Sequence, residues 1–421
     1  MTARLSALIA WCLFDCATAG YFAVIVTFVF GAYFTQAVAA EATLGTALWG
    51  QASSAAGLVV ALSAPALGAI ADQGGRRKPW IGLFIPLAAL ASLALWFVRP
   101  DPAYVPLALG LVVLGTVSTE FAHVFYNALL PTLVRPERLG RLSGLGWGTG
   151  YVGGIVCLGL ALTLFIQPDV PALGLDKATA EQVRIVGPLV ALWFLLFAVP
   201  LFLLTPDVPR TGLAAAAALR LGLAELAGTL RQARAQPNTL RFLIANMLYI
   251  DGLTTLFAFG GIYASGTFGF SLAEVIRFGI ALNVTAALGA ALFAFIDDRI
   301  GAKPTVMIAL AGLMASGAGV LLVHSVAWFW AWSLLLGTFV GPAQAASRSL
   351  MAALAPQEKR AEMFGLFALS GKATAFTGPA VLGWVTYWTD SQRWGMATIL
   401  VFFAVGFLML TTVTPPRRAG I

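Results

Sequence analysis

The chain has 421 residues, of which 60% are hydrophobic and 10% are charged, and its formal net charge is +7. Soluble domains carry about 25% charged residues, so this composition excludes a soluble globular protein and indicates an integral membrane protein. Lys and Arg lie between apolar runs and form no basic domain, which argues against a nucleic-acid partner.

Twelve apolar runs are long enough to cross a membrane, which takes roughly 20 helical residues. The first run is read as a span because no small-residue cleavage site of a signal peptide follows it. The predicted spans are residues 8–33, 48–71, 79–98, 104–130, 144–166, 186–205, 241–264, 272–296, 304–324, 327–350, 363–387 and 393–414. The fold class predicted is all-α, with twelve transmembrane helices.

The positive charges predict the orientation. Eighteen of the 25 Lys and Arg residues lie in the two tails and the loops of one side, and four lie in the loops of the other side. Because cytoplasmic loops carry the excess of Lys and Arg, we expect a multi-pass protein of the cell inner membrane with both termini cytoplasmic.

Two loop patterns occur twice. Asp72 and Gly75 after the second span match Asp298 and Gly301 after the eighth span. The stretch from Asn127 to Gly144 after the fourth span has the same length as 348–365 after the tenth span. This repeat predicts two six-helix bundles, 1–205 and 241–421, joined by a cytoplasmic linker, 206–240, and parallel repeats are typical of transporters.

The loop after the second span, Gly68-Ala-Ile-Ala-Asp72-Gln-Gly-Gly75-Arg76-Arg77, resembles the signature loop of the major facilitator superfamily. Gln73 departs from that pattern, which usually has a basic residue there. The resemblance implies the fold of that superfamily. It also implies a cytoplasmic gate motif, whose members here are Gly68, Asp72, Gly75, Arg76 and Arg77, with Asp298 and Gly301 in the second copy.

A narrower resemblance is carried by three stretches: Trp11-x-x-Phe14-Asp15, Tyr249-Ile250-Asp251-Gly252, and Ser370-Gly371-Lys372 followed by Gly378-Pro379. They resemble the vacuole-effluxer-like branch of the superfamily. Its fungal members are linked to the export of amino acids from the vacuole. Ile250 and the pair Thr18-Ala19 depart from residues that are frequent in the branch.

Polar and ionisable residues within spans are the candidates for a transport site, because they are costly in a membrane unless they have a function or a partner. The candidates for solute or proton binding are Asp15, Glu120, His123, Asn127, Asn246, Asp251 and Lys372. In the superfamily that the chain resembles, spans one, four, seven and ten line the central cavity, and these spans hold most of the candidates.

Each candidate has a structural alternative. Glu120, His123 and Asn127 share one helix face and are read as a proton relay or as an interhelical hydrogen-bond cluster. Asp251, with Asn246, binds a solute amine or braces a neighbouring helix, and Asp15 is its pseudo-symmetric counterpart. Lys372 pairs with a buried charge or meets a solute carboxylate. Arg348, at the end of span ten, is expected to snorkel to the lipid headgroups.

The function that the sequence favours is secondary transport of a small solute, such as an amino acid or similar zwitterion, by alternating access and with possible proton coupling. The alternatives are a non-transporting receptor or scaffold, and a membrane-embedded enzyme that uses Glu120 and His123. No nucleophile–base pair or set of metal ligands is recognisable, so we expect no catalytic residues, metal or cofactor. The expected partners are the solute and the lipid bilayer, and the protein is expected to be monomeric.

Overall fold

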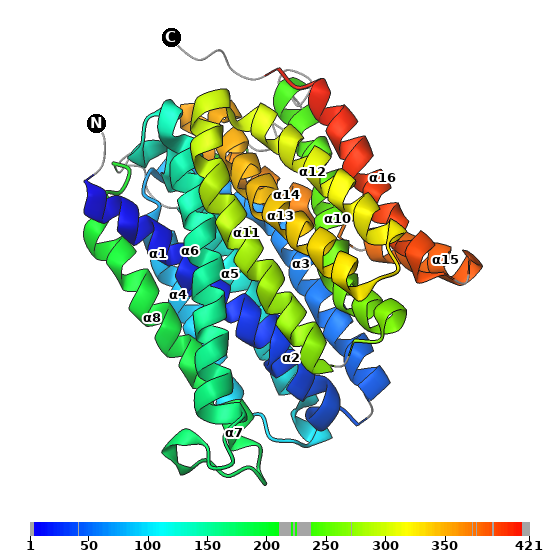
Figure 1. Ribbon diagram of the computed structural model, residues 1–421. Helices are drawn as coiled ribbons and strands as arrows, with labels where there is room; N and C mark the ends of the chain where they lie inside the picture. Colours follow the sequence, from blue (N-terminus) through cyan, green and yellow to red (C-terminus); the bar gives the residue numbers. More distant parts are fainter. Residues whose placement is uncertain are drawn as a thin grey trace. The chain divides into compact units, whose positions relative to one another are not determined.

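The computed structural model describes residues 4–40, 42–209, 220–221, 224, 237–270, 272–372, 374–375, 377–389 and 391–414. Within these ranges every regular element is a helix (Figure 1). Eleven helical stretches are long and apolar enough to cross a membrane, judged by length and composition over the described residues. This confirms the all-helical membrane fold predicted from the apolar runs.

The first six spans are built on α1 (Leu5–Tyr21), α3 (Ala42–Gly74), α4 (Lys78–Ala94), α5 (Val105–Leu133), α6 (Leu139–Leu160) and α8 (Val186–Leu204). The first span continues through a π-helical segment (Phe22–Phe28), α2 (Phe30–Tyr33) and a second π-helical segment (Phe34–Val38). The shorter elements are the π-helix Ala161–Ile166, α7 (Glu181–Arg184), and the 3₁₀ turns Leu95–Phe97, Pro102–Tyr104, Pro136–Arg138 and Ala172–Gly174.

The later spans are built on α10 (Pro237–Phe268), α11 (Leu272–Ile300), α12 (Ala302–Leu322), α13 (Val326–Leu354), α14 (Arg360–Lys372), α15 (Thr377–Thr389) and α16 (Gln392–Thr411). A 3₁₀ turn, Gln357–Lys359, precedes α14. The 3₁₀ turn Pro136–Arg138 takes the same place before α6. The two loops that repeat in the sequence therefore adopt the same local structure.

The eleventh predicted span, 363–387, is interrupted. It consists of α14 and α15, which have 13 residues each, with Thr374 and Ala375 in a turn between them. At 1.5 Å per residue each half is about 20 Å long, too short to cross a membrane alone. This interruption explains why eleven uninterrupted spanning helices are found where twelve spans were predicted.

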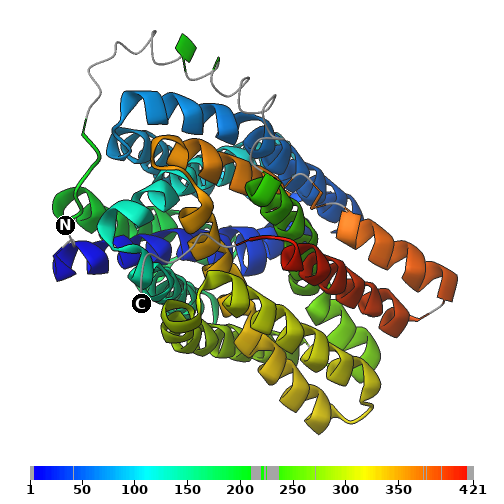
Figure 2. The same ribbon diagram turned by 90° about the horizontal axis from the view of Figure 1, so that it is seen from above.

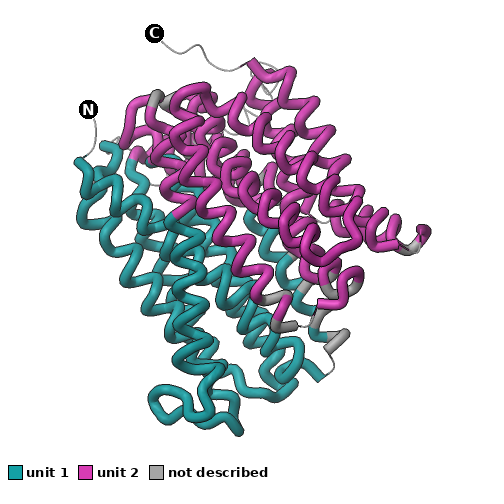
Figure 3. The backbone as a smooth tube through the Cα atoms, viewed as in Figure 1, with its two compact units in different colours: residues 1–60, 76–129, 149–209 teal, residues 61–75, 130–148, 210–421 magenta. Residues whose placement is uncertain are grey.

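The described chain forms two compact units (Figure 3). Unit 1 consists of residues 1–60, 76–129 and 149–209, and unit 2 of residues 61–75, 130–148 and 210–421. The helices α3, α5 and α6 contribute residues to both units. Most of the predicted linker, 206–240, lies outside the described residues, so the division of the chain at that linker stays a prediction.

Small residues allow close helix packing inside each unit. In unit 1, a Cβ atom at Gly153 of α6 would lie 2.9 Å from the Cα atom of Cys16 in α1. In unit 2, a Cβ atom at Gly144 would collide with Ala294 of α11 and lie 2.7 Å from the Ala290 carbonyl oxygen. Close backbone approach of this kind is how membrane helices gain packing without a hydrophobic driving force.

Candidate functional site

A polar contact joins the first and fourth spans in unit 1. Thr18 Oγ1 of α1 lies 3.0 Å from His123 Nε2 of α5. The Thr18 hydroxyl also lies 3.2 Å from the backbone oxygen of Asp15, one turn earlier. Thr18 is 2% exposed and Asp15 is 8% exposed, so both residues are within the packed interior of the unit.

The other two candidates on α5, Glu120 and Asn127, are partly exposed, as is His123. Asp15 packs against Gly150 of α6, where a Cβ atom would lie 3.4 Å from the Asp15 Cβ atom. The structure therefore places the four candidates of this unit on two helices, α1 and α5, and Thr18 of α1 contacts one of them, His123 of α5.

Aromatic residues hold α1 against α5 on both sides of this contact. The rings of Trp11 and Tyr126 are stacked with centroids 4.5 Å apart. Trp11 Nε1 donates to the Tyr126 backbone oxygen at 3.3 Å, and the Tyr126 hydroxyl donates to the Trp11 backbone oxygen at 3.1 Å. Further along, the Tyr21 hydroxyl lies 3.0 Å from both Thr116 Oγ1 and the Val112 backbone oxygen.

This aromatic frame was not predicted as part of the site. Its signal in the sequence is that Trp11, Tyr21 and Tyr126 each carry a polar atom that needs a partner when buried in an apolar span. Because the three residues fix α1 on α5, they position Thr18 against His123.

A second polar network lies in unit 2, around α10. Asn246 Nδ2 donates to Ser370 Oγ of α14 at 2.8 Å. A Cβ atom at Gly378, near the beginning of α15, would lie 3.1 Å from the Asp251 backbone oxygen, so α15 packs closely on α10 at this residue. Asn246 is 1% exposed and Asp251 is 3% exposed. A side-chain hydrogen bond thus ties α10 to the last turn of α14, and close packing places α15, which follows the interruption, against Asp251.

The same helix is bonded to α13, because the Tyr249 hydroxyl lies 2.6 Å from Ser347 Oγ. Thr254 follows Asp251 by three residues, as Thr18 follows Asp15, but Thr254 is exposed. Its neighbour Thr255 is buried and donates to the Asp251 backbone oxygen at 2.8 Å. Lys372 is the last residue of α14, and its side chain lies outside the described part of the chain.

The two copies of the gate motif share one backbone geometry. Gly75 follows α3 with φ +83°, and Gly301 follows α11 with φ +97°. The amide of Gly75 donates to the Ala71 oxygen and that of Gly301 to the Asp297 oxygen, each four residues earlier. Positive φ is a glycine conformation that ends a helix, which explains why glycine stands at both positions. Gly68 is buried and Asp72 is partly exposed within α3.

The motif arginines have a partner that the sequence did not indicate. Asp207, after α8, accepts a hydrogen bond from the backbone amide of Arg77 at 2.9 Å. The same carboxylate lies 3.8 Å from the Arg76 guanidinium. Arg77 is the residue before α4, so Asp207 caps a helix to which it is not adjacent in sequence.

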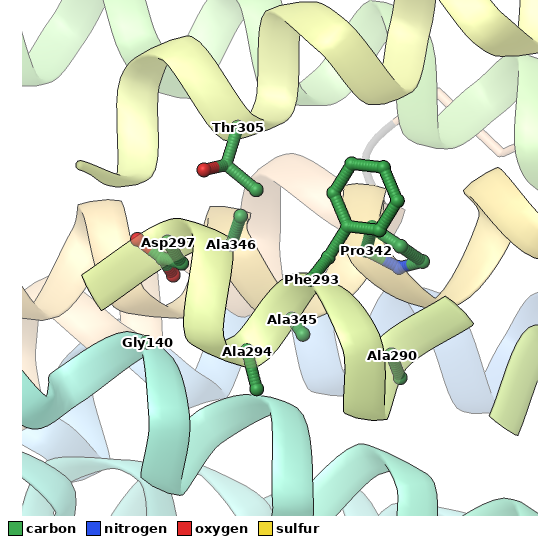
Figure 4. Close-up of a pocket in the computed structure, with 9 residues that line it drawn as sticks. All are labelled: Gly140, Ala290, Phe293, Ala294, Asp297, Thr305, Pro342, Ala345 and Ala346. Carbon is green, nitrogen blue, oxygen red and sulfur yellow. The ribbon is translucent and has the colours of Figure 1, made fainter. Parts of the chain in front are cut away.

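In the second copy, Asp298 meets the beginning of α6. Its carboxylate accepts from the Arg141 backbone amide at 2.8 Å and lies 3.1 Å from Arg141 Nε. A negative charge is stabilised at a helix N-terminus by the helix dipole. The preceding residue, Asp297, packs against Gly140 of α6, and both residues line a narrow space between α6, α11, α12 and α13 (Figure 4).

Arg348 does not reach the lipid headgroups, so that prediction was wrong. It is 3% exposed, and its guanidinium donates to Ser143 Oγ at 2.9 Å and to the Ser143 backbone oxygen at 2.6 Å. It also lies over the ring of Trp147, 5.6 Å from the centroid. Local sequence places Arg348 at a span end, but α6 supplies acceptors within reach, and a paired guanidinium is stable when buried.

Comparison with known proteins identifies the family of the chain. The model of the family described as "Vacuole effluxer Atg22 like" matches residues 46–419. The chain belongs to the vacuole effluxer Atg22-like family. YxiO of Bacillus subtilis, an MFS-type transporter, is 25% identical over 411 residues, which are 96% of this chain and 94% of that protein.

A fungal relative of the family matches a shorter part. Autophagy-related protein 22 of Cryptococcus neoformans is 27% identical over 297 residues, 66% of this chain and 53% of the fungal protein. The chain thus spans about half the length of that relative.

Solved transporters of the major facilitator superfamily share the fold. FucP in its outward conformation has a TM-score of 0.75 at 16% identity, covering 98% of this chain and 99% of FucP. The proton:xylose symporter XylE has a TM-score of 0.72 at 16% identity, covering 98% of this chain and 95% of XylE. This member of the Atg22-like family therefore has the major facilitator fold of twelve helices, and it is a multi-pass membrane transporter and not an enzyme.

Proposed function

We propose that the protein is a secondary transporter that moves a small zwitterion, such as an amino acid, across the cytoplasmic membrane by alternating access, driven by a proton gradient. The family's description as vacuole effluxers supports export as the direction of transport. The observation that carries the proposal is the interruption of the eleventh span beside Asp251.

Near this interruption, α10 carries the buried carboxylate of Asp251 and the side-chain oxygen of Asn246. Asn246 Oδ1 is buried and has no hydrogen-bond partner among the described residues. The ends of interrupted helices leave backbone groups without intrahelical partners, and transporters bind solutes and ions at such places. We assign Asp251 and Asn246 Oδ1 to the protonated amine of the solute, and Lys372 to its carboxylate.

The proton-carrying groups of the proposal are in unit 1. His123 is bonded to Thr18 on a neighbouring helix, and Glu120 lies one turn earlier on α5. Imidazole and partly buried carboxyl groups titrate near neutral pH after modest shifts of their pKa. Asp15 and Asn127 complete this set.

Solute transport is tested in proteoliposomes loaded with the twenty common amino acids one at a time. We expect counterflow of at least one amino acid by the wild type and its loss in Asp251→Asn, which keeps the side-chain shape and removes the charge. Asp169→Asn, at an exposed site in a loop, is the matched control and retains counterflow. Absence of flux for every amino acid excludes this substrate class.

Proton coupling has a separate test. We expect an imposed pH gradient to accelerate net solute flux by the wild type and to leave net flux by Glu120→Gln unchanged. Solute exchange without a pH gradient should persist in Glu120→Gln. Net flux that is the same with and without the gradient overturns the coupling and leaves the solute assignment in place.

The orientation is part of the proposal. The excess of Lys and Arg on one side supports an inner-membrane protein with both termini cytoplasmic. Cysteine substitutions at Thr2 and Ala419, in a variant lacking the three native cysteines, would be labelled by a membrane-impermeant maleimide only after the cytoplasmic side is opened. Labelling in intact cells contradicts this orientation.

A further inference from the structure

A cavity of ≈ 150 Å³ lies in unit 2 between α10, α15 and α16. Figure 2 shows α15 and α16 side by side. The walls of the cavity include the side chains of Phe259, Tyr263, Leu382, Thr386, Gln392 and Met396. Tyr263 lies 12 residues beyond Asp251 on α10, about 18 Å along the helix, so this cavity is separate from the solute site proposed above.

Two polar atoms in this wall lack partners. The Tyr263 hydroxyl and Thr386 Oγ1 are buried and form no hydrogen bond with any residue that the structure describes. Tyr263 is 2% exposed. Leaving a buried hydroxyl without a partner costs about 1–3 kcal/mol, so such groups are normally satisfied by a ligand or a water. Both hydroxyls can donate and accept.

Apart from Gln392, the other described side chains of the wall are apolar, and none of the described lining residues carries a formal charge. Gln392 uses its side-chain oxygen to accept from Thr267 Oγ1 at 2.9 Å. The nearest cation in sequence, Arg393, is bonded to the backbone oxygens of Leu321 and Val323 at 2.6 and 2.8 Å. Because no charged side chain of the described residues lines the cavity, it favours an uncharged ligand with one or two hydrogen-bonding groups.

Three exposed tryptophans lie close in sequence to residues of the cavity wall. Trp384 and Trp388 of α15 and Trp394 of α16 are 65%, 76% and 65% exposed, and their positions are within one or two turns of Thr386 or Gln392. Exposed tryptophans of membrane proteins lie at the level of the lipid headgroups. A ligand that reaches the cavity from the membrane therefore has an apolar chain and a polar end.

We propose that the cavity between α10, α15 and α16 binds an uncharged membrane amphiphile, whose hydroxyl or amide group bonds to Tyr263 and Thr386 and whose chain packs on Phe259, Leu382 and Met396. One water occupies about 30 Å³, so the cavity has the volume of about five waters. An alkyl chain of medium length fills this space.

The probe is 1-octanol carrying a diazirine, photolysed with the wild-type protein in phosphatidylcholine nanodiscs. We expect saturable labelling of the peptides that contain Phe259 and Met396, and competition by 1-octanol but not by octane. Competition should strengthen about fourfold per methylene along the 1-alkanols until the cavity is filled. Equal competition by octane, or unsaturable labelling spread over all lipid-facing helices, overturns the proposal.

Two variants test the polar contacts. Tyr263→Phe and Thr386→Val each remove one hydroxyl at nearly constant shape, and each should weaken competition by 1-octanol about fivefold. Thr389→Val is the control, because that hydroxyl is exposed and bonds to the Val385 oxygen of its own helix. Unchanged competition in both cavity variants overturns the assignment. If a variant does not fold, the comparison of octanol with octane in the wild-type protein still tests the proposal.

Discussion

Thr18 of α1 and His123 of α5 are 105 positions apart in sequence and meet at 3.0 Å through Oγ1 and Nε2. Thr18 lies one helix turn after Asp15 on the first span, so this contact links that part of the span to the predicted proton relay on the fourth span. The stacked rings of Trp11 and Tyr126 hold the same two helices together. Asp15 is therefore part of a braced helix pair.

Replacing Thr18 by Val removes the partner of His123 while keeping the volume of the side chain. We expect a loss of about 1 kcal/mol of stability, measured as a lower midpoint of thermal unfolding, and an altered pH profile of flux. Thr163→Val is the control, since its exposed hydroxyl bonds to the Gly159 oxygen, one turn earlier in the same span. An equal decrease in both variants would show that the interhelical contact contributes nothing.

Replacing Gly153 by Ala forces a methyl group against the Cα atom of Cys16, 2.9 Å away. Overpacking of this kind costs about 1–3 kcal/mol, so the thermal midpoint of Gly153→Ala should fall. Gly159 lies on the same helix with no atom within 4 Å of the added methyl group, and Gly159→Ala should be neutral or stabilising. If both variants unfold at the wild-type temperature, α1 and α6 are less closely packed than described.

Replacing Gly75 by Ala places a Cβ atom on a residue with φ +83°. The left-handed conformation costs about 1–2 kcal/mol for a residue with a Cβ atom, so we expect lower thermal stability. The neighbouring Gly74, the last residue of α3, has open space around it, and Gly74→Ala should not destabilise the protein. Equal stability of the two variants would contradict the positive φ at Gly75.

Replacing Asp207 by Ala removes the acceptor for the Arg77 amide at the beginning of α4. Loss of a helix cap costs about 1 kcal/mol, and we expect a lower thermal midpoint together with faster proteolysis near residues 76–78. Asp169→Ala provides a comparison at an exposed loop carboxylate. A thermal midpoint no lower than that of Asp169→Ala would show that Asp207 is not a cap.

The spans, the repeat and the family were predictable from the sequence because their signals are local. An apolar run of 20 residues has to form a helix in a bilayer, since its backbone groups find no water there. Gly75 and Gly301, which stand after apolar runs, mark helix ends because glycine adopts the positive φ that ends a helix. These signals do not depend on which helices become neighbours.

The contacts that give each polar residue its environment needed the tertiary structure. Arg348 is buried because Ser143, 205 positions away, supplies acceptors, and Asp207 caps a helix 130 positions earlier. After the interruption at Thr374, α15 packs on Asp251 of another helix, where a Cβ atom at Gly378 would lie 3.1 Å from the Asp251 backbone oxygen. The sequence by itself determined which residues enter the membrane, through the cost of burying polar groups. Only the packing of distant helices decided which polar groups acquire partners and which, like Asn246 Oδ1, remain without one among the described residues.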